Sequence, residues 1–147
     1  MDSSPAQTTF QTDGTMNEDF KGLRRWTGLH GVEPDSVHLP DVPPGWQGLV
    51  AVTRTPEESS VIGPWRGTGL GPYRGWSVIG PLAPDLVGVL AAYLEPLRAA
   101  GIPVLAFSTH DTDWMFVDEA RSGAAEAAWR AAGVPITDAS GGSGKPL

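Results

Sequence analysis

The densest group of polar side chains in this chain of 147 residues is the run 108–113, Ser-Thr-His-Asp-Thr-Asp. Serine, histidine and aspartate together suggest acyl transfer, in which a base activates a hydroxyl nucleophile. The spacing argues against it, because neighbours on a strand point to opposite faces and a nucleophile needs its base within hydrogen-bond reach. His110, Asp111 and Asp113 are also metal-ligand types, but no further histidine or carboxylate stands at an informative spacing. Two other hypotheses fit better: side chains that bond the backbone of a turn, and a turn that presents hydroxyls and a carboxylate to a ligand.

The composition limits the classes of protein to which this chain can belong. With 40% hydrophobic and 18% charged residues, the chain suits one compact domain or two very small fused ones. It contains no cysteine, which excludes a disulfide scaffold, a thiolate metal site and a cysteine nucleophile. Ten basic against 17 acidic side chains give a net charge of −7 without a basic cluster, so nucleic acid and anionic membranes are poor partners. No apolar run approaches the ~18 residues of a membrane span and the N-terminus lacks the apolar stretch of a signal peptide, so we expect a cytoplasmic protein. We expect no cofactor and no metal.

The elements that position the polar run follow from apolar periodicity and from helix-ending residues. The strongest helix signal covers 84–100, where apolar residues recur every three or four positions. Pro84 suits the first turn of this helix, Gly101 suits its end, and Pro96 should bend it. A second, alanine-rich helix is expected at 124–132.

Shorter elements are expected around these helices. Ser122 is a suitable cap for the second helix, and Thr55 caps one expected helical turn at 55–58. A glycine-rich break is expected at 63–75. The expected strands are 26–32, 49–53, 60–62, 76–79, 104–107 and 114–117, with an edge strand at 134–136.

The order of these elements predicts an α+β fold. From residue 76 it is strand, helix, strand, strand, helix, short strand, which is one split βαβ unit of the ferredoxin-like kind, with helices on one face of an antiparallel sheet. Residues 24–63 would be a degenerate first copy whose helices are reduced to turns. We therefore expect segments 76–82, 104–108 and 113–118 to be neighbouring strands that both helices cover.

Aromatic residues form a second notable group. The chain has six tryptophans, and Trp65 and Tyr73 lie within the glycine-rich break. Most such rings serve the core. An alternative hypothesis is that Trp65 or Tyr73 lines a pocket for an apolar or cationic ligand.

Four segments together resemble one family, the small bacterial proteins built from two ACT-like modules, which are related to the cytosolic arginine sensors of animals and to the regulatory modules of aspartate kinase. The resemblance covers about residues 22–136. The segments are Val52-Thr53-Arg54-Thr55-Pro56-Glu57-Glu58, Gly75-Trp76 with Gly80-Pro81-Leu82, Pro96-Leu97 with Ala100-Gly101-Ile102-Pro103, and Phe107-Ser108-Thr109-His110-Asp111-Thr112-Asp113.

The resemblance implies tandem ACT-like modules of ferredoxin-like βαββαβ topology. The expected division is a disordered tail at 1–18, a first, degenerate module at 19–74, a second module at 75–137 and a flexible tail at 138–147. The tails are polar or rich in Gly and Ser, with too few apolar groups to offset the entropy of ordering. We also expect a homodimer, because sheet edges with unpaired amides tend to be covered by a partner.

The resemblance further implies that an amino acid binds at the seam between modules. The loop that opens the long helix would offer backbone amides to the ligand carboxylate, and the Ser-Thr-x-Asp turn would hold its ammonium group. Ser60 would reach in from the first module. The ligand-binding residues expected on this basis are Ser60, Pro84, Asp85, Leu86, Ser108, Thr109, His110 and Asp111.

Departures from the family pattern keep other functions open. The loop 83–88 lacks the hydroxyl side chains found in relatives, Asp85 would repel a carboxylate unless it points outward, and His110 replaces an aromatic residue. The first hypothesis is a non-catalytic sensor or accessory protein. The alternative is a small biosynthetic enzyme in which His110 and Asp111 perform acid–base chemistry. A third is a structural domain whose pocket has closed.

Overall fold

A computed structural model describes residues 20–34, 38–83, 85 and 87–139 of the chain. The predicted tail at 1–18 and residues 140–147 of the predicted C-terminal tail lie outside this part. None of the helices within the described residues is long and apolar enough to cross a membrane. The elements, in chain order, are β1 (Leu23–Pro34), β2 (Ala51–Arg54), β3 (Ser59–Pro64), β4 (Leu70–Val78), α1 (Val89–Ala99), β5 (Leu105–Ser108), β6 (Asp113–Asp118), the 3-10 turn η2 (Glu119–Arg121), α2 (Ser122–Ala131) and β7 (Ile136–Asp138).

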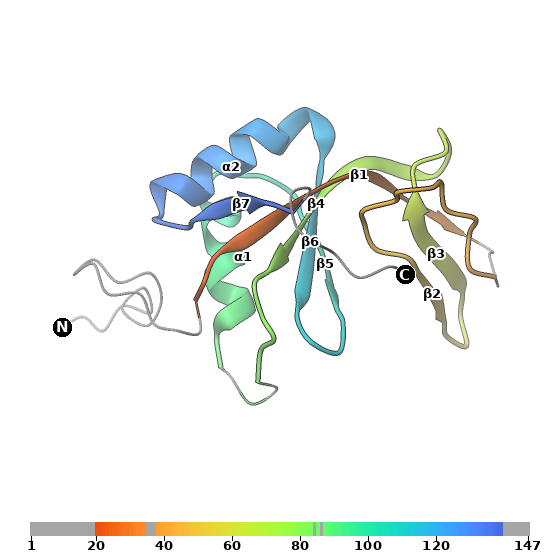
Figure 1. The fold of residues 1–147 in the computed structure, drawn as a ribbon, viewed down its shortest axis with the longest axis horizontal. Helices are drawn as coiled ribbons and strands as arrows, with labels where there is room; N and C mark the ends of the chain where they lie inside the picture. The colour runs from red at the N-terminus through yellow and green to blue at the C-terminus, as the bar shows by residue number, and fades with distance from the viewer. Residues whose placement is uncertain (1–19, 35–37, 84, 86, 140–147) are drawn as a thin grey trace.

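The seven strands of the described residues form one sheet in the order β2-β3-β1-β4-β6-β5, with β7 paired to β1 (Figure 1). The long strand β1 holds the sheet together. Along one side it pairs with β4, and along its other side it pairs first with β7 in parallel and then, from His30 to Pro34, with β3 in antiparallel register. Figure 1 shows β2 and β3 at one end of β1 and both helices at the other.

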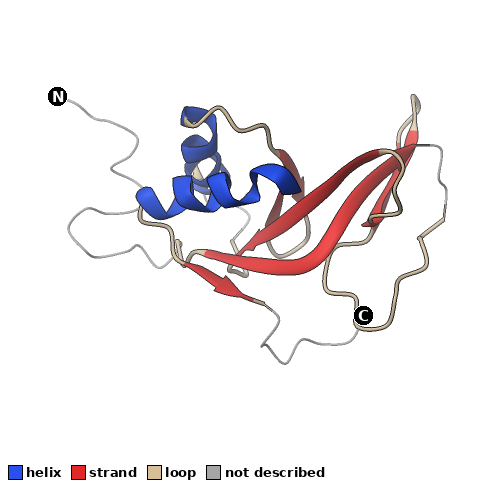
Figure 2. Cartoon of the chain, turned by 90° about the horizontal axis from the view of Figure 1, so that it is seen from above, coloured by secondary structure: helices blue, strands red, loops and turns tan. Residues whose placement is uncertain are grey.

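The second half of the chain has the predicted order of elements. β4, β6 and β5 are neighbouring antiparallel strands, as expected, and α1 and α2 both lie on one side of the sheet (Figure 2). β1 lies between β4 and β7, so a strand from the first part of the chain completes the sheet of the second. The predicted boundary at residues 74 and 75 falls within β4. The division into two modules stays a prediction.

The predicted glycine-rich break at 63–75 is wrong for most of its length. β3 runs to Pro64 and β4 starts at Leu70, because β1 offers a pairing partner on each side. Gly71 of this segment, like Gly31 of β1, serves close packing instead. A Cβ atom on Gly31 or Gly71 would lie 2.7 or 2.9 Å from the Trp65 ring, so only glycine lets this ring lie on the backbone of two strands.

The first helix is shorter than predicted. α1 starts at Val89 rather than at residue 84, after Gly88, whose φ of 81° is left-handed and favours glycine. Pro96 lies inside α1, and Gly101 follows its end with a φ of 73°, as predicted for a helix stop.

Two predicted caps work differently from expectation. Asp118 accepts a hydrogen bond from the amide of Ala120 at 2.9 Å and caps η2, while Ser122 begins α2 and its hydroxyl donates to the Glu119 carbonyl. No helix forms at 55–58, because β2 and β3 already pair at Arg54 and Ser59 and these four residues close the hairpin. The Thr55 hydroxyl does accept bonds from the next turn, from two backbone amides at 3.1 Å each.

The core lies between the helices and one face of the sheet. Alternate residues of β6 and β4 point toward the helices, and Trp129 of α2 donates its indole N–H to the Tyr93 carbonyl of α1 at 2.7 Å. The Trp76 and Trp129 rings meet edge to face at 5.0 Å. The buried core residues are Phe20, Leu23, Trp76, Val78, Val89, Tyr93, Leu97, Ile102, Met115, Val117, Ala125, Trp129 and Val134.

A buried carboxylate fastens α2 to the sheet. Glu126 accepts two hydrogen bonds of 2.6 Å from Arg25 of β1 and one of 2.8 Å from the Trp76 indole of β4. Arg25 also bonds Asp138 of β7 at 3.0 Å, and the amide of Ala139 bonds the Arg25 carbonyl. The predicted flexible tail therefore starts too early, because residues 138 and 139 are held against β1.

Candidate functional site

A groove of about 420 Å³ forms where the turn between β5 and β6 meets the start of α1. The two segments are far apart in the sequence, and the antiparallel pairing of β4 with β6 brings them together. The lining residues are Leu82, Ala83, Gly88, Val89, Leu90, Ala91, Ser108, Thr109, His110, Asp111, Thr112 and Asp113.

The turn is closed by its own hydroxyls. The amide and the hydroxyl of Thr109 donate to the Thr112 carbonyl at 2.8 and 3.0 Å, and Ser108 donates to the Asp113 carboxylate at 2.6 Å. The interpretation of these side chains as turn formers is therefore correct. Because the Ser108 hydroxyl donates to Asp113, it has no bond to a histidine that would mark an activated nucleophile.

The same turn is anchored to the connection between β4 and α1. The Thr112 hydroxyl donates to the Val78 carbonyl at 2.6 Å, and the amide of Leu82 donates to the Asp111 carbonyl at 2.8 Å. A Cβ on Gly80 would lie 3.1 Å from that carbonyl oxygen, so the close approach suits glycine. These contacts fix the position of one wall of the groove relative to the other.

One wall carries the backbone amides of the first turn of α1. No side chain caps α1, and its first helical hydrogen bond runs from the amide of Ala92 to the Gly88 carbonyl. The amides of residues 89–91 therefore have no acceptor inside the helix. The first turn of α1 has no acidic residue, so the partial positive charge of the helix start is not neutralised there.

The opposite wall carries negative charge. The Asp111 side chain is 69% exposed and its Oδ1 lies 2.7 Å from Nδ1 of His110, whose side chain is fully exposed. One carboxylate oxygen of Asp111 remains for a ligand. The groove thus has a positive end at α1 and a negative end at the turn.

The structure unites only part of the predicted site. Ser108, Thr109, His110 and Asp111 line the groove, together with parts of the helix-opening loop. Asp85 is exposed and does not line it, and Pro84 and Leu86 lie outside the described residues.

Ser60 is separated from the groove by the length of β1. It pairs with Pro34, at one end of that strand, whereas Val78, which holds the turn, pairs with Leu23 at the other. The two ends of a strand of this length are on the order of 30 Å apart. Ser60 therefore does not reach the groove of its own chain.

Sequence reasoning expected backbone amides at the start of the long helix but placed that start at residue 84, too early in the chain. Gly88 and residues 89–91 form a wall because the helix starts late, and Gly88 before an apolar run was the available signal. Within the described residues no group of three His, Cys, Asp or Glu side chains could hold a metal ion.

Comparisons with known proteins agree with the fold. Residues 73–130 match the family model of the ACT domain. No curated protein matches the chain. A crystal structure from Agobacterium tumefaciens is similar over 79% of this chain and 91% of its own, with 23% identity and a TM-score of 0.64. A Vibrio cholerae protein of unknown function, described as a possible transport protein, is similar over 75% of this chain and 89% of its own, with 16% identity and a TM-score of 0.56. The segment from β4 into α2 is therefore similar to an ACT domain.

Proposed function

We propose that this chain is a non-catalytic regulatory module that binds an amino acid in the groove between the 108–113 turn and the start of α1. ACT domains generally bind small-molecule ligands in regulation. The observation that carries the proposal is the opposite polarity of the two walls of the groove. A free amino acid carries a carboxylate and an ammonium group, which require such a pair of walls.

The ligand carboxylate is placed at the uncapped start of α1. Exposed helix starts stabilise an anion by about 0.3–1 kcal/mol, and by up to ~2 kcal/mol when partly buried. The ammonium group is placed at Asp111, where a charge-assisted hydrogen bond forms. Ser108 and Thr109 orient it through their hydroxyl oxygens.

A second copy of the chain completes the proposed assembly. β2 and β5 stand at the two ends of the sheet, and each has a described partner strand on one side. Val87, next in the chain to Gly88 of the groove, is 93% exposed and is therefore open to contact with a second copy. Ser60, too distant within one chain, would contribute to the groove only from this second copy.

Thermal denaturation with each of the common amino acids tests the proposal. A ligand that binds only the folded state adds about 2.7 kcal/mol at 100 times its Kd, which raises the Tm of a chain of this size by roughly 5–10 °C. Asp111→Asn should remove most of this shift. Glu57→Gln, the same change of charge in the exposed turn between β2 and β3, should leave it intact.

Two results would overturn the proposal. One is that no amino acid raises the Tm at millimolar concentration. The other is that Asp111→Asn responds to the ligand like the wild-type chain, which would place the ligand elsewhere.

The contact between His110 and Asp111 favours one second candidate, a small enzyme that uses this pair in acid–base catalysis. His110→Asn distinguishes the two functions. A binding protein keeps most of its ligand affinity in this variant, whereas an enzyme loses turnover by roughly 10²-fold or more.

A further inference from the structure

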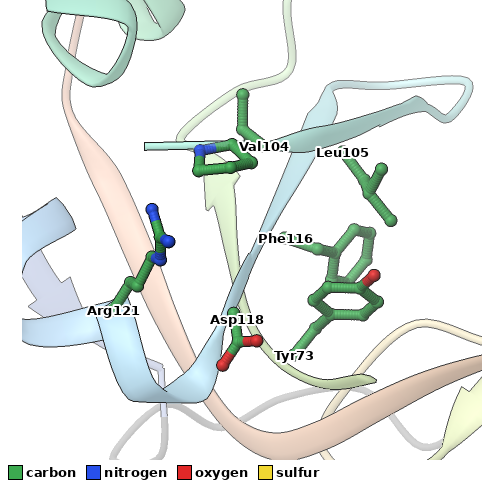
Figure 3. Close-up of a pocket in the computed structure, with 7 residues that line it drawn as sticks. Tyr73, Val104, Leu105, Phe116, Asp118 and Arg121 are labelled. Carbon is green, nitrogen blue, oxygen red and sulfur yellow. The ribbon is translucent and has the colours of Figure 1, made fainter. Parts of the chain in front are cut away.

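A second pocket, of about 230 Å³, shares no lining residue with the groove at the 108–113 turn. Figure 3 draws the side chains that line it. Phe116 lies between Met115 and Val117, which belong to the core under the helices, so its side chain is on the opposite, helix-free face of the sheet. The pocket is bounded by β4, β5, β6 and η2. Its lining residues are Tyr73, Pro103, Val104, Leu105, Phe116, Asp118 and Arg121.

The floor of this pocket is apolar. Phe116 is 2% exposed and pairs across the sheet with Leu105, which is 41% exposed and forms the open side. The Tyr73 ring comes from β4 at the position paired with Asp118 (Figure 3). Tyr73 therefore lines a pocket, as one hypothesis expected, whereas Trp65 covers the backbone of Gly31 and Gly71. The floor offers an aromatic and aliphatic surface to an apolar group.

The rim of the pocket carries one charge of each sign. Asp118 uses Oδ1 to cap the amide of Ala120 and keeps a second carboxylate oxygen for another donor. Arg121 reaches the Gly101 carbonyl only at 3.4 Å, a long hydrogen bond. Among the ion pairs between described residues, none includes Asp118 or Arg121. Both charges are therefore available to a ligand.

We propose that this pocket is a second binding site, which takes a small zwitterion with an apolar side chain, such as an apolar α-amino acid. Its ammonium group binds Asp118, its carboxylate binds Arg121, and its side chain lies on Tyr73, Leu105 and Phe116. A simple anion is repelled by Asp118 and a simple cation by Arg121. A neutral apolar molecule leaves both charges partly desolvated without a partner, which costs free energy.

The proposal concerns a site separate from the groove, so its test removes the groove first. In the Asp111→Asn variant, L-phenylalanine is titrated while backbone amide shifts are followed by NMR. The expected shifts concentrate at Val104, Leu105, Asp118 and Arg121. Two analogues serve as probes of charge: N-acetyl-L-phenylalanine lacks the ammonium group and phenethylamine lacks the carboxylate. Each should bind at least about tenfold more weakly.

Two substitutions in the same background locate the charges. Asp118→Asn removes the charge but keeps a side chain that caps η2, and Arg121→Met keeps the apolar stem. Each should weaken the binding of L-phenylalanine at least about tenfold. In Asp118→Asn, N-acetyl-L-phenylalanine should then bind as tightly as L-phenylalanine, and in Arg121→Met the same should hold for phenethylamine. Glu57→Gln and Arg54→Met, exposed residues at the far end of the sheet, should change nothing.

The proposal is overturned if L-phenylalanine produces no shifts at the pocket at millimolar concentration, or if both analogues bind as tightly as the amino acid. It is also overturned if Asp118→Asn and Arg121→Met bind like their parent. A failure of amino-acid binding at the groove leaves these outcomes unaffected, because the groove is already disabled in the parent.

Discussion

His30 of β1 is the most confined ionisable side chain on the helix-free face. It is fully buried, and the rings of Trp46, Trp114 and Phe116 meet it edge to face at 5.1, 5.9 and 4.7 Å. Its Nε2 accepts a hydrogen bond of 2.8 Å from the amide of Leu49, so the neutral ring carries its proton on Nδ1, which has no hydrogen-bond partner in the described structure. Burial is the main cause that lowers the pKa of His30, to about 4.

This histidine predicts a pH dependence of stability. In the unfolded chain His30 has a pKa near 6.5, whereas in the folded chain it takes up a proton only near pH 4. The contribution of neutral His30 to the free energy of unfolding is therefore complete above pH 6.5 and is lost as the pH falls toward 4. The full change is roughly 3 kcal/mol. Urea denaturation of wild type and His30→Asn at pH 7 and pH 4.5 measures it.

The difference in unfolding free energy between pH 7 and pH 4.5 should shrink in His30→Asn. It should persist in His110→Asn, because the His110 side chain is fully exposed. An equal loss of stability in wild type and His30→Asn would show that other groups cause the acid sensitivity.

At the scale of the elements, Glu126 connects α2 with both β1 and β4. Burial raises the pKa of Glu126, but the hydrogen bonds from Arg25 and Trp76 outweigh it and hold this pKa below its usual value. The hydrogen bond to Glu126 is in turn the main cause that raises the pKa of Arg25. The pair is therefore fully charged at neutral pH.

Removal of this carboxylate should loosen α2. Glu126→Ala leaves Arg25 half-buried without its main counter-charge and the Trp76 indole without an acceptor, so we expect a loss of about 3 kcal/mol of unfolding free energy. Urea denaturation measures it, and hydrogen exchange should show the loss in α2 and β7 first.

The matched control is Glu95→Ala, which removes an exposed partner of Arg98 on α1 and should have little effect. A Glu126→Ala chain as stable as Glu95→Ala would mean that apolar packing alone holds α2 on the sheet.

At the scale of the whole molecule, the two ends of the sheet predict self-association. β5 has one described partner strand, β6, and its Ala106 is exposed. Unpaired edges of this kind tend to be covered in native assemblies, so light scattering should report twice the mass of the chain.

A lysine on this edge separates edge pairing from other contacts. Ala106→Lys should shift the equilibrium toward monomer, because edge lysines oppose strand pairing, while Ala127→Lys on the exposed face of α2 should not. A wild-type monomer at all practical concentrations would contradict the proposed homodimer.

The local elements were predictable because their signals are local. Apolar periodicity marks α1, β-branched and aromatic runs mark β5 and β6, and Ser, Thr and Asp between them mark a turn that closes on itself. The order of elements after residue 76 was enough to predict neighbouring strands under two helices. The polar half of the groove followed from the same turn.

Only the tertiary structure decided what depends on long-range pairing. β1 pairs with other strands along both of its sides, so most of the expected glycine-rich break is strand. The same strand pairs with β7, and its length separates Ser60 from the groove. Asp118 lines the same pocket as Tyr73 only because β4 and β6 pair side by side, and Arg121 of η2 follows shortly after β6. Such contacts join residues tens of positions apart in the sequence. Composition and periodicity describe short segments and do not predict which distant segments pair.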